Sequence, residues 1–193
     1  MAKDSSFNED SENLLNPNSE VVVLSDGSGR SLPCYVEHSI EIDDQEYVLL
    51  MPIHIPIEIF AWDGDDDEDE TLLDIPDEEL DEVFPTARAV LAEQDMTLER
   101  TALTLTATGE LPQPDDETLI TLDLGEDEDE MSPEQLQLLA EFYFKDQKYS
   151  ICTPTDPLLI FARVEENGEP KLLSPEEFQT MRPQLEDKLF DDL

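Results

Sequence analysis

Residues 44–52 read DQEYVLLMP, and residues 146–154 read DQKYSICTP. Both stretches place aspartate and glutamine shortly before a tyrosine, continue through small or apolar residues, and end at a proline. The order holds downstream, where the tripeptide IFA of residues 59–61 recurs at residues 160–162. Acidic residues match by chance in so acidic a chain, but tyrosine, proline and phenylalanine do so much less readily. The repeat therefore predicts two related structural units.

Short apolar runs separated by turn residues predict strands in the first half of the chain. Residues 21–24 and 31–36 flank a glycine-rich turn and predict one hairpin. Residues 40–42 and 46–51, on either side of two aspartates, predict a second hairpin, and residues 57–62 predict a further strand.

A helix is expected after the acidic run 63–70. Asp74 is a candidate cap before Pro76, and the following acids suit a helix N-terminus. Apolar residues then recur at helical spacing, and Pro85 is expected to kink or split the helix.

In the second half, residues 98–108 and 119–122 predict strands, and residues 125–130 form a second acidic run. Ser132-Pro133-Glu134-Gln135 has the spacing of a capping box and predicts a short helix. Strands are expected over 142–145, 149–153 and 158–164. A second capping box at residues 174–177 predicts a final helix with Phe178, Met181, Leu185 and Leu189 on one face.

The predicted fold class is α+β, with two related small antiparallel sheet units that are each closed by a C-terminal helix. Residues 1–19 are polar and acidic and predict a disordered leader. Residues 20–95 are assigned to the first unit and residues 96–193 to the second.

The charge is strongly one-sided, because 51 Asp and Glu face 10 Lys and Arg, for a formal net charge of −41 in 193 residues. Nucleic-acid affinity and attraction to anionic lipid both rest on basic residues, so we expect neither partner. Lys145, Lys148, Arg163, Lys171, Arg182 and Lys188 all lie in the last third, so the first half is expected to be nearly pure anion. Such a field attracts a basic protein surface.

The N-terminus lacks the apolar core of a secretory signal, and no later run is long enough for a membrane span. Cys34 and Cys152 are far apart and outside any C-x-x-C spacing, which favours two ordinary thiols over a disulfide between them. We therefore expect a cytoplasmic protein.

The order of motifs resembles two families of unknown function. Residues 21–24, 26–29, 44–47 and 48–52 resemble an acidic bacterial domain (DUF1292-like), with Gln45 where that family commonly has lysine. From about Met96 onward, residues 101–111 and 142–154 resemble a second domain (DUF3727-like) of photosynthetic bacteria and plastids. The resemblance implies a photosynthetic lineage and an auxiliary role, and it brings no catalytic site.

No catalytic, cofactor-binding or metal-binding residue is predicted. Asp63, Asp65 and Asp67 have the spacing of the first ligands of a calcium loop, but Glu68 stands where that loop needs glycine. His38 and His54 have no companions at zinc-ligand spacing. Glycine-rich phosphate loops and nucleophile motifs are also missing from the sequence.

We therefore predict a non-catalytic interaction protein, an adaptor or assembly factor that binds a basic protein partner. The residues expected to bind that partner are Trp62, at the end of a strand, and the acids Asp65, Asp66, Asp67, Glu68 and Asp69 beside it. Two alternatives stay open: an inhibitor that mimics nucleic acid, and an enzyme of unknown type. A mimic needs its carboxylates on a rigid stripe, whereas the densest charge here falls in two predicted loops.

Overall fold

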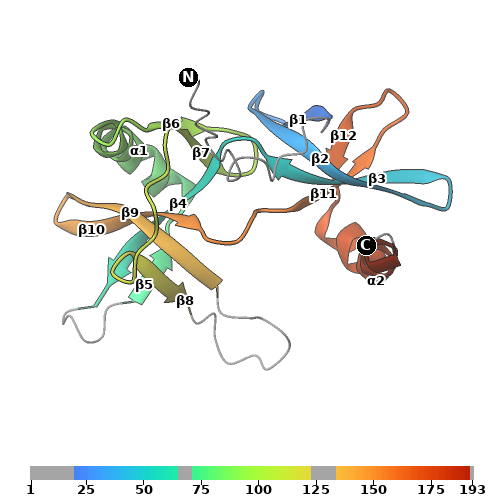
Figure 1. The fold of residues 1–193 in the computed structure, drawn as a ribbon. Coiled ribbons are helices and arrows are strands. Elements are labelled where there is room, and N and C mark those ends of the chain that lie inside the picture. Colours follow the sequence, from blue (N-terminus) through green and yellow to red (C-terminus); the bar gives the residue numbers. More distant parts are fainter. Residues whose placement is uncertain (1–19, 65–70, 123–133, 192–193) are drawn as a thin grey trace, which may run out of the picture.

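The computed structural model describes residues 20–64, 71–122 and 134–191. Within those residues the chain forms two antiparallel sheets, and each sheet has one of the two helices packed on it (Figure 1). The α+β class and a C-terminal helix are thus confirmed. The proposed leader, residues 1–19, lies outside the described residues.

The first sheet combines strands from both halves of the chain in the order β1-β2-β3-β11-β12. Three of its strands precede residue 96, and the other two follow residue 159. Its members are β1 (Val21–Ser25), β2 (Ser31–Ile42), β3 (Gln45–Pro52), β11 (Ile160–Val164) and β12 (Pro170–Leu172).

The second sheet is equally mixed and has the order β6-β7-β4-β10-β9-β8, with β5 paired to β4. Its members are β4 (Ile55–Asp63), β5 (Thr71–Asp74), β6 (Thr97–Arg100), β7 (Leu105–Thr108), β8 (Leu119–Leu122), β9 (Glu134–Phe144) and β10 (Gln147–Pro154). The chain leaves the first sheet after β3 to form β4, and it leaves the second sheet after β10 to form β11. Each predicted half therefore contributes strands to both sheets.

The two central strands β3 and β10 pair with corresponding neighbours in the same register. Strand β3 lies between β2 and β11, and β10 lies between β9 and β4. Tyr47 of β3 lies opposite Ile40 and Arg163, while Tyr149 of β10 lies opposite Phe142 and Ala61. One constant shift in residue number relates these pairs. The same shift relates the two β-bulges, which fall between Val36 and His38 in β2 and opposite Ile151 and Cys152 in β9.

The turns that precede β3 and β10 also correspond. Asp43 and Asp44 have φ of 51° and 62°, and Lys145 and Asp146 have φ of 48° and 66°, which is the left-handed pair of a two-residue hairpin turn. The glutamine after each turn then reaches the strand from the other half. The side-chain amide of Gln45 donates to the Val164 carbonyl at 2.7 Å, and that of Gln147 donates to the Trp62 carbonyl.

The tripeptide IFA does not follow this register. Ile151 lies opposite Ile59, whereas the corresponding Leu49 lies opposite Phe161, so the two tripeptides are displaced by one residue. Because side chains alternate across a strand, Phe60 and Phe161 lie on faces of their two sheets that do not correspond to each other. Phe60 is buried with Leu136 and Cys152, while Phe161 packs beside Tyr47 under a helix.

Helix α1 (Asp77–Ala92) packs on the second sheet, and its residues Val83, Ala87 and Leu91 are fully buried there. Acids occupy its first turn, but Pro76 is the N-cap residue and Asp74 belongs to β5. The prediction that Asp74 caps the helix is therefore wrong. The helix also runs through Pro85 as one element, so the proline does not split it.

Helix α2 (Pro175–Asp191) packs on the first sheet through Leu185, which is buried against Ile40, Ile42 and Tyr47. The predicted capping box is present here. The Glu177 backbone N–H donates to Ser174 Oγ at 3.2 Å, and the Ser174 backbone N–H donates to Glu177 Oε2 at 3.0 Å. The hydrogen bond from the Ser174 backbone N–H is the main cause that holds the pKa of Glu177 below its ordinary value, and the contact with the Ser174 side chain adds to it.

The helix predicted at Ser132 is wrong in the residues that the structure describes, because Glu134 and Gln135 begin the strand β9. That strand pairs with β8 on one side and β10 on the other. Two ladders of hydrogen bonds and a buried Leu136 outweigh a local capping pattern. Residues 98–108 likewise form the hairpin β6–β7 instead of one strand.

Candidate functional site

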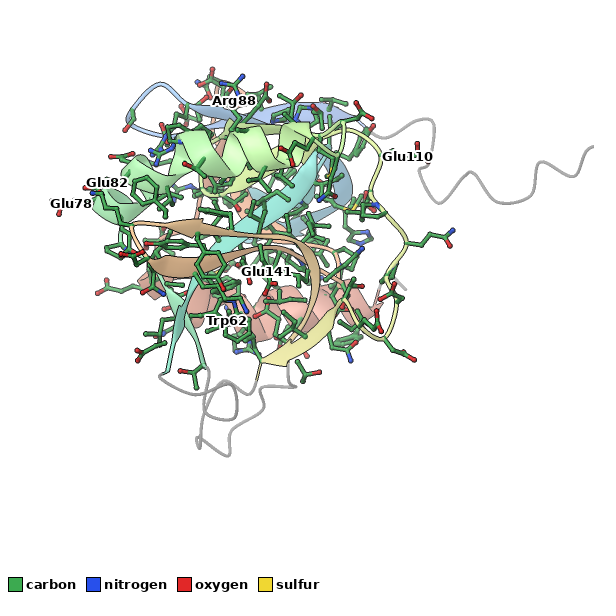
Figure 2. The ribbon with its side chains drawn as sticks, turned by 90° about the vertical axis from the view of Figure 1, so that its left-hand side faces the viewer. Trp62, Glu78, Glu82, Arg88, Glu110 and Glu141 are labelled. Atoms are coloured by element: carbon green, nitrogen blue, oxygen red, sulfur yellow. The ribbon has the colours of Figure 1, made fainter. Side chains whose placement is uncertain are left out.

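Trp62 is held in place at the end of β4, opposite Leu72 of β5. Its indole N–H donates to Ser150 Oγ at 2.6 Å, and the Lys148 ammonium lies 4.8 Å from its ring centroid. Figure 2 shows the side chain below the strands, near Glu141. The ring is half-buried, and its hydrogen-bonding group already has a partner within the protein. Asp65, Asp66, Asp67, Glu68 and Asp69 lie outside the described residues.

The two cysteines are free and lie in different hydrophobic clusters. Burial raises the pKa of Cys34 to about 11 and that of Cys152 to about 12. Both thiols are therefore protonated at neutral pH and are poor nucleophiles. In the part of the chain that the structure describes, no group of three or more His, Cys, Asp or Glu side chains could hold a metal ion.

An apolar surface that the sequence did not predict as a site lies on the first sheet, which we call the open face. Side chains alternate along a strand, so Val21, Tyr35 and Met51, which oppose one another, share this face. Ile160 lies opposite Leu50 in an antiparallel pair, so the preceding residue, Leu159, lies level with Met51. Leu159 therefore continues the same row. The open face consists of Val21, Val23, Pro33, Tyr35, Met51, Ile53 and Leu159.

The row formed by Val21, Tyr35, Met51 and Leu159 is accessible at both ends, and Val23 of the neighbouring row is accessible too. Val21 is 52% exposed, Val23 50% and Leu159 50%. Helix α2 covers the same side of the sheet only farther along, over Ile40, Ile42 and Tyr47. Among the described residues, no member of the open face belongs to a hydrophobic cluster.

The corresponding face of the second sheet is covered by the protein itself. The constant shift that relates β3 to β10 matches Tyr35 to Gln137, Met51 to Thr153 and Leu159 to Ile57, which are 3%, 2% and 1% exposed. The Gln137 side-chain amide donates to the Pro112 carbonyl at 2.7 Å, and β7 pairs with β4 beside Ile57. Ile57 also lies in the hydrophobic cluster that contains Val83 and Leu91 of α1, so α1 and residues 97–118 together supply the cover.

A signal for the open face was present in the sequence. Residues 21–24 read VVVL, a continuous apolar run, whereas a strand with one face in water alternates apolar and polar residues. The structure shows that alternate members of this run, Val22 and Leu24, enter the core, while Val21 and Val23 stay at the surface.

The chain belongs to the family described as protein of unknown function DUF3727, whose model matches residues 95–192. Residues 28–92 match the model of a second family, described as protein of unknown function DUF1292. The expected order of the two domains is confirmed, and the boundary falls between α1 and β6. A search of curated proteins gave no match, and a search of solved structures gave none either.

No helix among the described residues is both long enough and apolar enough to cross a membrane.

Proposed function

We propose that the chain is a non-catalytic acidic interaction protein, an adaptor or assembly factor, whose open face binds a basic protein partner. The open face is the observation that carries this proposal. Large contiguous apolar surfaces are uncommon on monomeric soluble proteins and mark interaction sites. Here the contrast is internal, because Gln137, Thr153 and Ile57 of the second sheet are buried, whereas the matching Tyr35 and Met51 are half-buried and Leu159 is exposed.

Charge favours a basic partner over a second copy of the chain. Two molecules that each carry a formal charge of −41 repel one another, whereas a basic surface is attracted. Glu37, at the bulge of β2, and Asp156, shortly before β11, are exposed acids near the rows of the open face in sequence. The acids Asp65, Asp66, Asp67, Glu68 and Asp69 add to the field that steers the partner, and Trp62 beside them offers it an aromatic contact.

We also propose that the two halves arose by duplication. The shared register, bulge, left-handed turn and turn glutamine support this origin. On this view both sheets once had the same exposed face, and residues 97–118 came to cover one of them. The resemblance to domains of photosynthetic bacteria and plastids supports a photosynthetic lineage, and the free thiols favour a cytoplasmic location.

The experiment replaces Tyr35 and Met51 by serine and measures binding kinetics against a partner isolated with the wild-type chain and then purified. We expect the Tyr35→Ser, Met51→Ser variant to dissociate at least about tenfold faster, because apolar contacts at the centre of an interface control dissociation. Tyr143→Ser is the control, since Tyr143 is 69% exposed and lies on β9, away from the open face.

Neutralising Asp65, Asp66, Asp67, Glu68 and Asp69 to Asn and Gln should instead slow association and flatten its salt dependence. Unchanged dissociation in the serine variant would refute the open face as the binding site. Concentration-dependent dimerisation of the wild-type chain that the same serine variant abolishes would identify a second copy as the occupant and refute the basic partner.

A nucleic-acid mimic remains a second candidate because helix α1 carries a rigid row of acids. Asp77, Glu78, Asp81 and Glu82 are exposed in its first turns, and Glu79 beside them is half-buried. Figure 2 shows Glu78 and Glu82 directed away from the body of the protein. However, Lys145 pairs with Glu82 at 2.7 Å and Arg100 with Asp81 at 2.6 Å, so the row is partly neutralised. Competition between double-stranded DNA and the chain for the purified partner tests this candidate.

A further inference from the structure

The few basic residues of the first half do not scatter over its acidic surface. Between Lys3 and Lys145 the sequence contains three residues that are lysine or arginine, namely Arg30, Arg88 and Arg100. They come from the β1–β2 turn, from α1 and from the end of β6. All three line one hollow of about 640 Å³. The expectation that this half is nearly pure anion therefore does not hold at this place.

Two of these arginines are oriented by acids beside the hollow. Arg30 Nε lies 2.7 Å from Asp26 Oδ2, and Arg100 Nη2 lies 2.6 Å from Asp81 Oδ1. The Arg100 guanidinium also lies over the Phe84 ring, 5.2 Å from its centroid. Each guanidinium has five N–H donors, so one carboxylate contact leaves others available to a ligand.

Arg88 differs from the other two. It is exposed on α1, and no ion pair joins it to an acid in the described part of the chain. Figure 2 shows it on the side of the helix near the β1–β2 hairpin, away from Glu78 and Glu82. An arginine whose role is to neutralise this helix would be expected beside those acids. Arg88 instead adds a third positive charge to the hollow.

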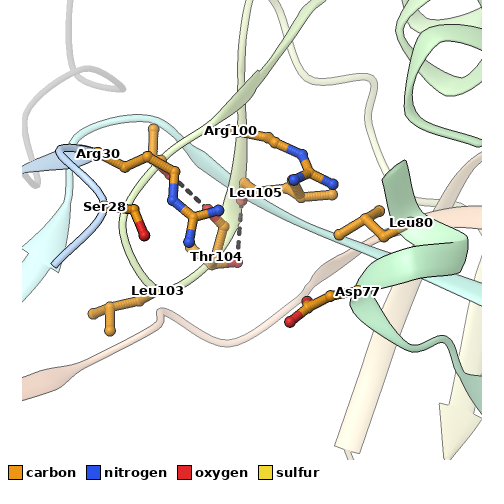
Figure 3. Close-up of a pocket in the computed structure, with 9 residues that line it drawn as sticks. Ser28, Arg30, Asp77, Leu80, Arg100, Leu103, Thr104 and Leu105 are labelled. Carbon is orange, nitrogen blue, oxygen red and sulfur yellow. Dashed lines mark hydrogen bonds between the residues drawn. The ribbon is translucent and has the colours of Figure 1, made fainter. Parts of the chain in front are cut away.

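The other residues that line the hollow are a histidine, an acid and several apolar side chains. His54 lines the hollow, and its Nδ1 is buried without a hydrogen-bond partner among the described residues. Glu99 is the acid in the lining, beside the apolar side chains of Pro33, Phe84 and Leu98. The nearest comparable hollow, of about 630 Å³, shares Arg30, Arg100 and Thr101 and also includes Asp77 (Figure 3).

We propose that this hollow, the arginine pocket, binds the oxyanion of a small molecule whose apolar part rests on Phe84 and Pro33. Guanidinium groups match the geometry of carboxylate and phosphate oxygens and hold them by paired, charge-assisted hydrogen bonds. Arg30 and Arg100 are each paired with an acid, whereas Arg88 has no ion pair among the described residues, so Arg88 supplies the charge that a bound anion compensates. The ligand class is therefore an aromatic or aliphatic carboxylate or phosphate ester.

The test uses the full chain with two probes, benzoate and phenyl phosphate, at constant ionic strength set with sodium chloride. Both probes carry an oxyanion on an apolar ring, and they separate carboxylate from phosphate recognition. Binding is followed by the chemical shifts of the arginine side-chain N–H groups and by the thermal midpoint. We expect saturable shifts at Arg88 and Arg100, and a rise in midpoint that chloride alone does not produce.

Arg88→Gln should weaken probe binding by about tenfold or more, because it removes a charge-assisted contact that no other residue replaces. Arg182→Gln, on α2, is the matched control and should bind like the wild type. Equal binding by both variants, or no shift beyond that of chloride, would overturn the proposal. The open face and the arginine pocket share Pro33, but the partner assay changes Tyr35 and Met51, which do not line the pocket, so a failure there leaves this result standing.

Discussion

The two sheets of this protein share a pattern of strands but differ in what covers them. In both, a two-residue left-handed turn leads into a central strand, β3 or β10, that pairs with a strand from the opposite half. Helix α1 and residues 97–118 together cover one face of the second sheet, whereas the corresponding rows of the first sheet remain open at their ends. Two sheets with corresponding strand pairings can therefore present different surfaces, because the segments packed on them differ.

Both sheets contain strands from both halves of the chain. Neither sheet is complete without strands from the other half, because β4 pairs with β10 and β11 pairs with β3. The hydrophobic clusters likewise mix residues from both halves. The stability of each sheet therefore depends on the whole chain.

Cutting the chain between the two matched families should have the largest effect. Residues 20–95 and residues 96–193, expressed separately, should each lack a cooperative unfolding transition, because each leaves unpaired strand edges and exposed core residues. Mixed together, the two fragments should regain native circular dichroism and a sigmoidal urea transition. A fragment that unfolds cooperatively alone would show that one half is an independent domain.

Removing buried leucines should affect the two sheets to a similar degree. Leu50 and Leu136 are both fully buried, and they pack beside Cys34 and Cys152 respectively. Leu50→Ala and Leu136→Ala should each lower the free energy of unfolding by about 2–5 kcal/mol. Urea denaturation measures both, with Leu111→Ala as the control because Leu111 is 39% exposed. A large effect in only one sheet would mean that the sheets unfold separately.

The paired tyrosines should reveal a difference between the sheets. The Tyr149 hydroxyl donates to Glu79 Oε1 at 2.6 Å and so links β10 to α1, and burial together with Glu79 raises its pKa to about 12. Tyr149→Phe should lower the free energy of unfolding by about 1–2 kcal/mol, because the carboxylate loses its donor. Tyr47→Phe is the matched control and should change stability by less than about 0.5 kcal/mol. Equal losses would contradict this assignment.

The smallest change in stability is expected for a substitution of Glu58 in β4. Burial, followed by repulsion from Glu134 and Asp74, raises its pKa above the ordinary value of 4.5. A carboxyl group of this kind favours the folded state when it is protonated, and that contribution is lost as the pH rises through the folded pKa. Glu58→Gln should therefore be slightly more stable than the wild type at pH 7, with a difference that vanishes below the ordinary pKa. A stability difference independent of pH would refute this cause.

Some elements could be predicted from short stretches because their determinants are local. The hairpins around residues 43–44 and 145–146 contain aspartates, which tolerate positive φ, and the α2 capping box depends on contacts three residues apart. The capping-box pattern at Ser132 predicted a helix, but Glu134 and Gln135 form a strand because they pair with residues outside that local pattern. Trp62 was recognised as a position of interest, but its hydrogen bond to Ser150 could not be foreseen from a local pattern.

By itself, the sequence determined the strand and turn content, the repeat, the two families and the negative charge, because these depend on residue type and on spacing within a few residues. Only the tertiary structure decided which strands pair, and with them the exchange between sheets, the open face and the arginine pocket. The physical reason is that every antiparallel strand can pair with many others. The choice among them is made by the simultaneous burial of side chains that lie far apart in the chain.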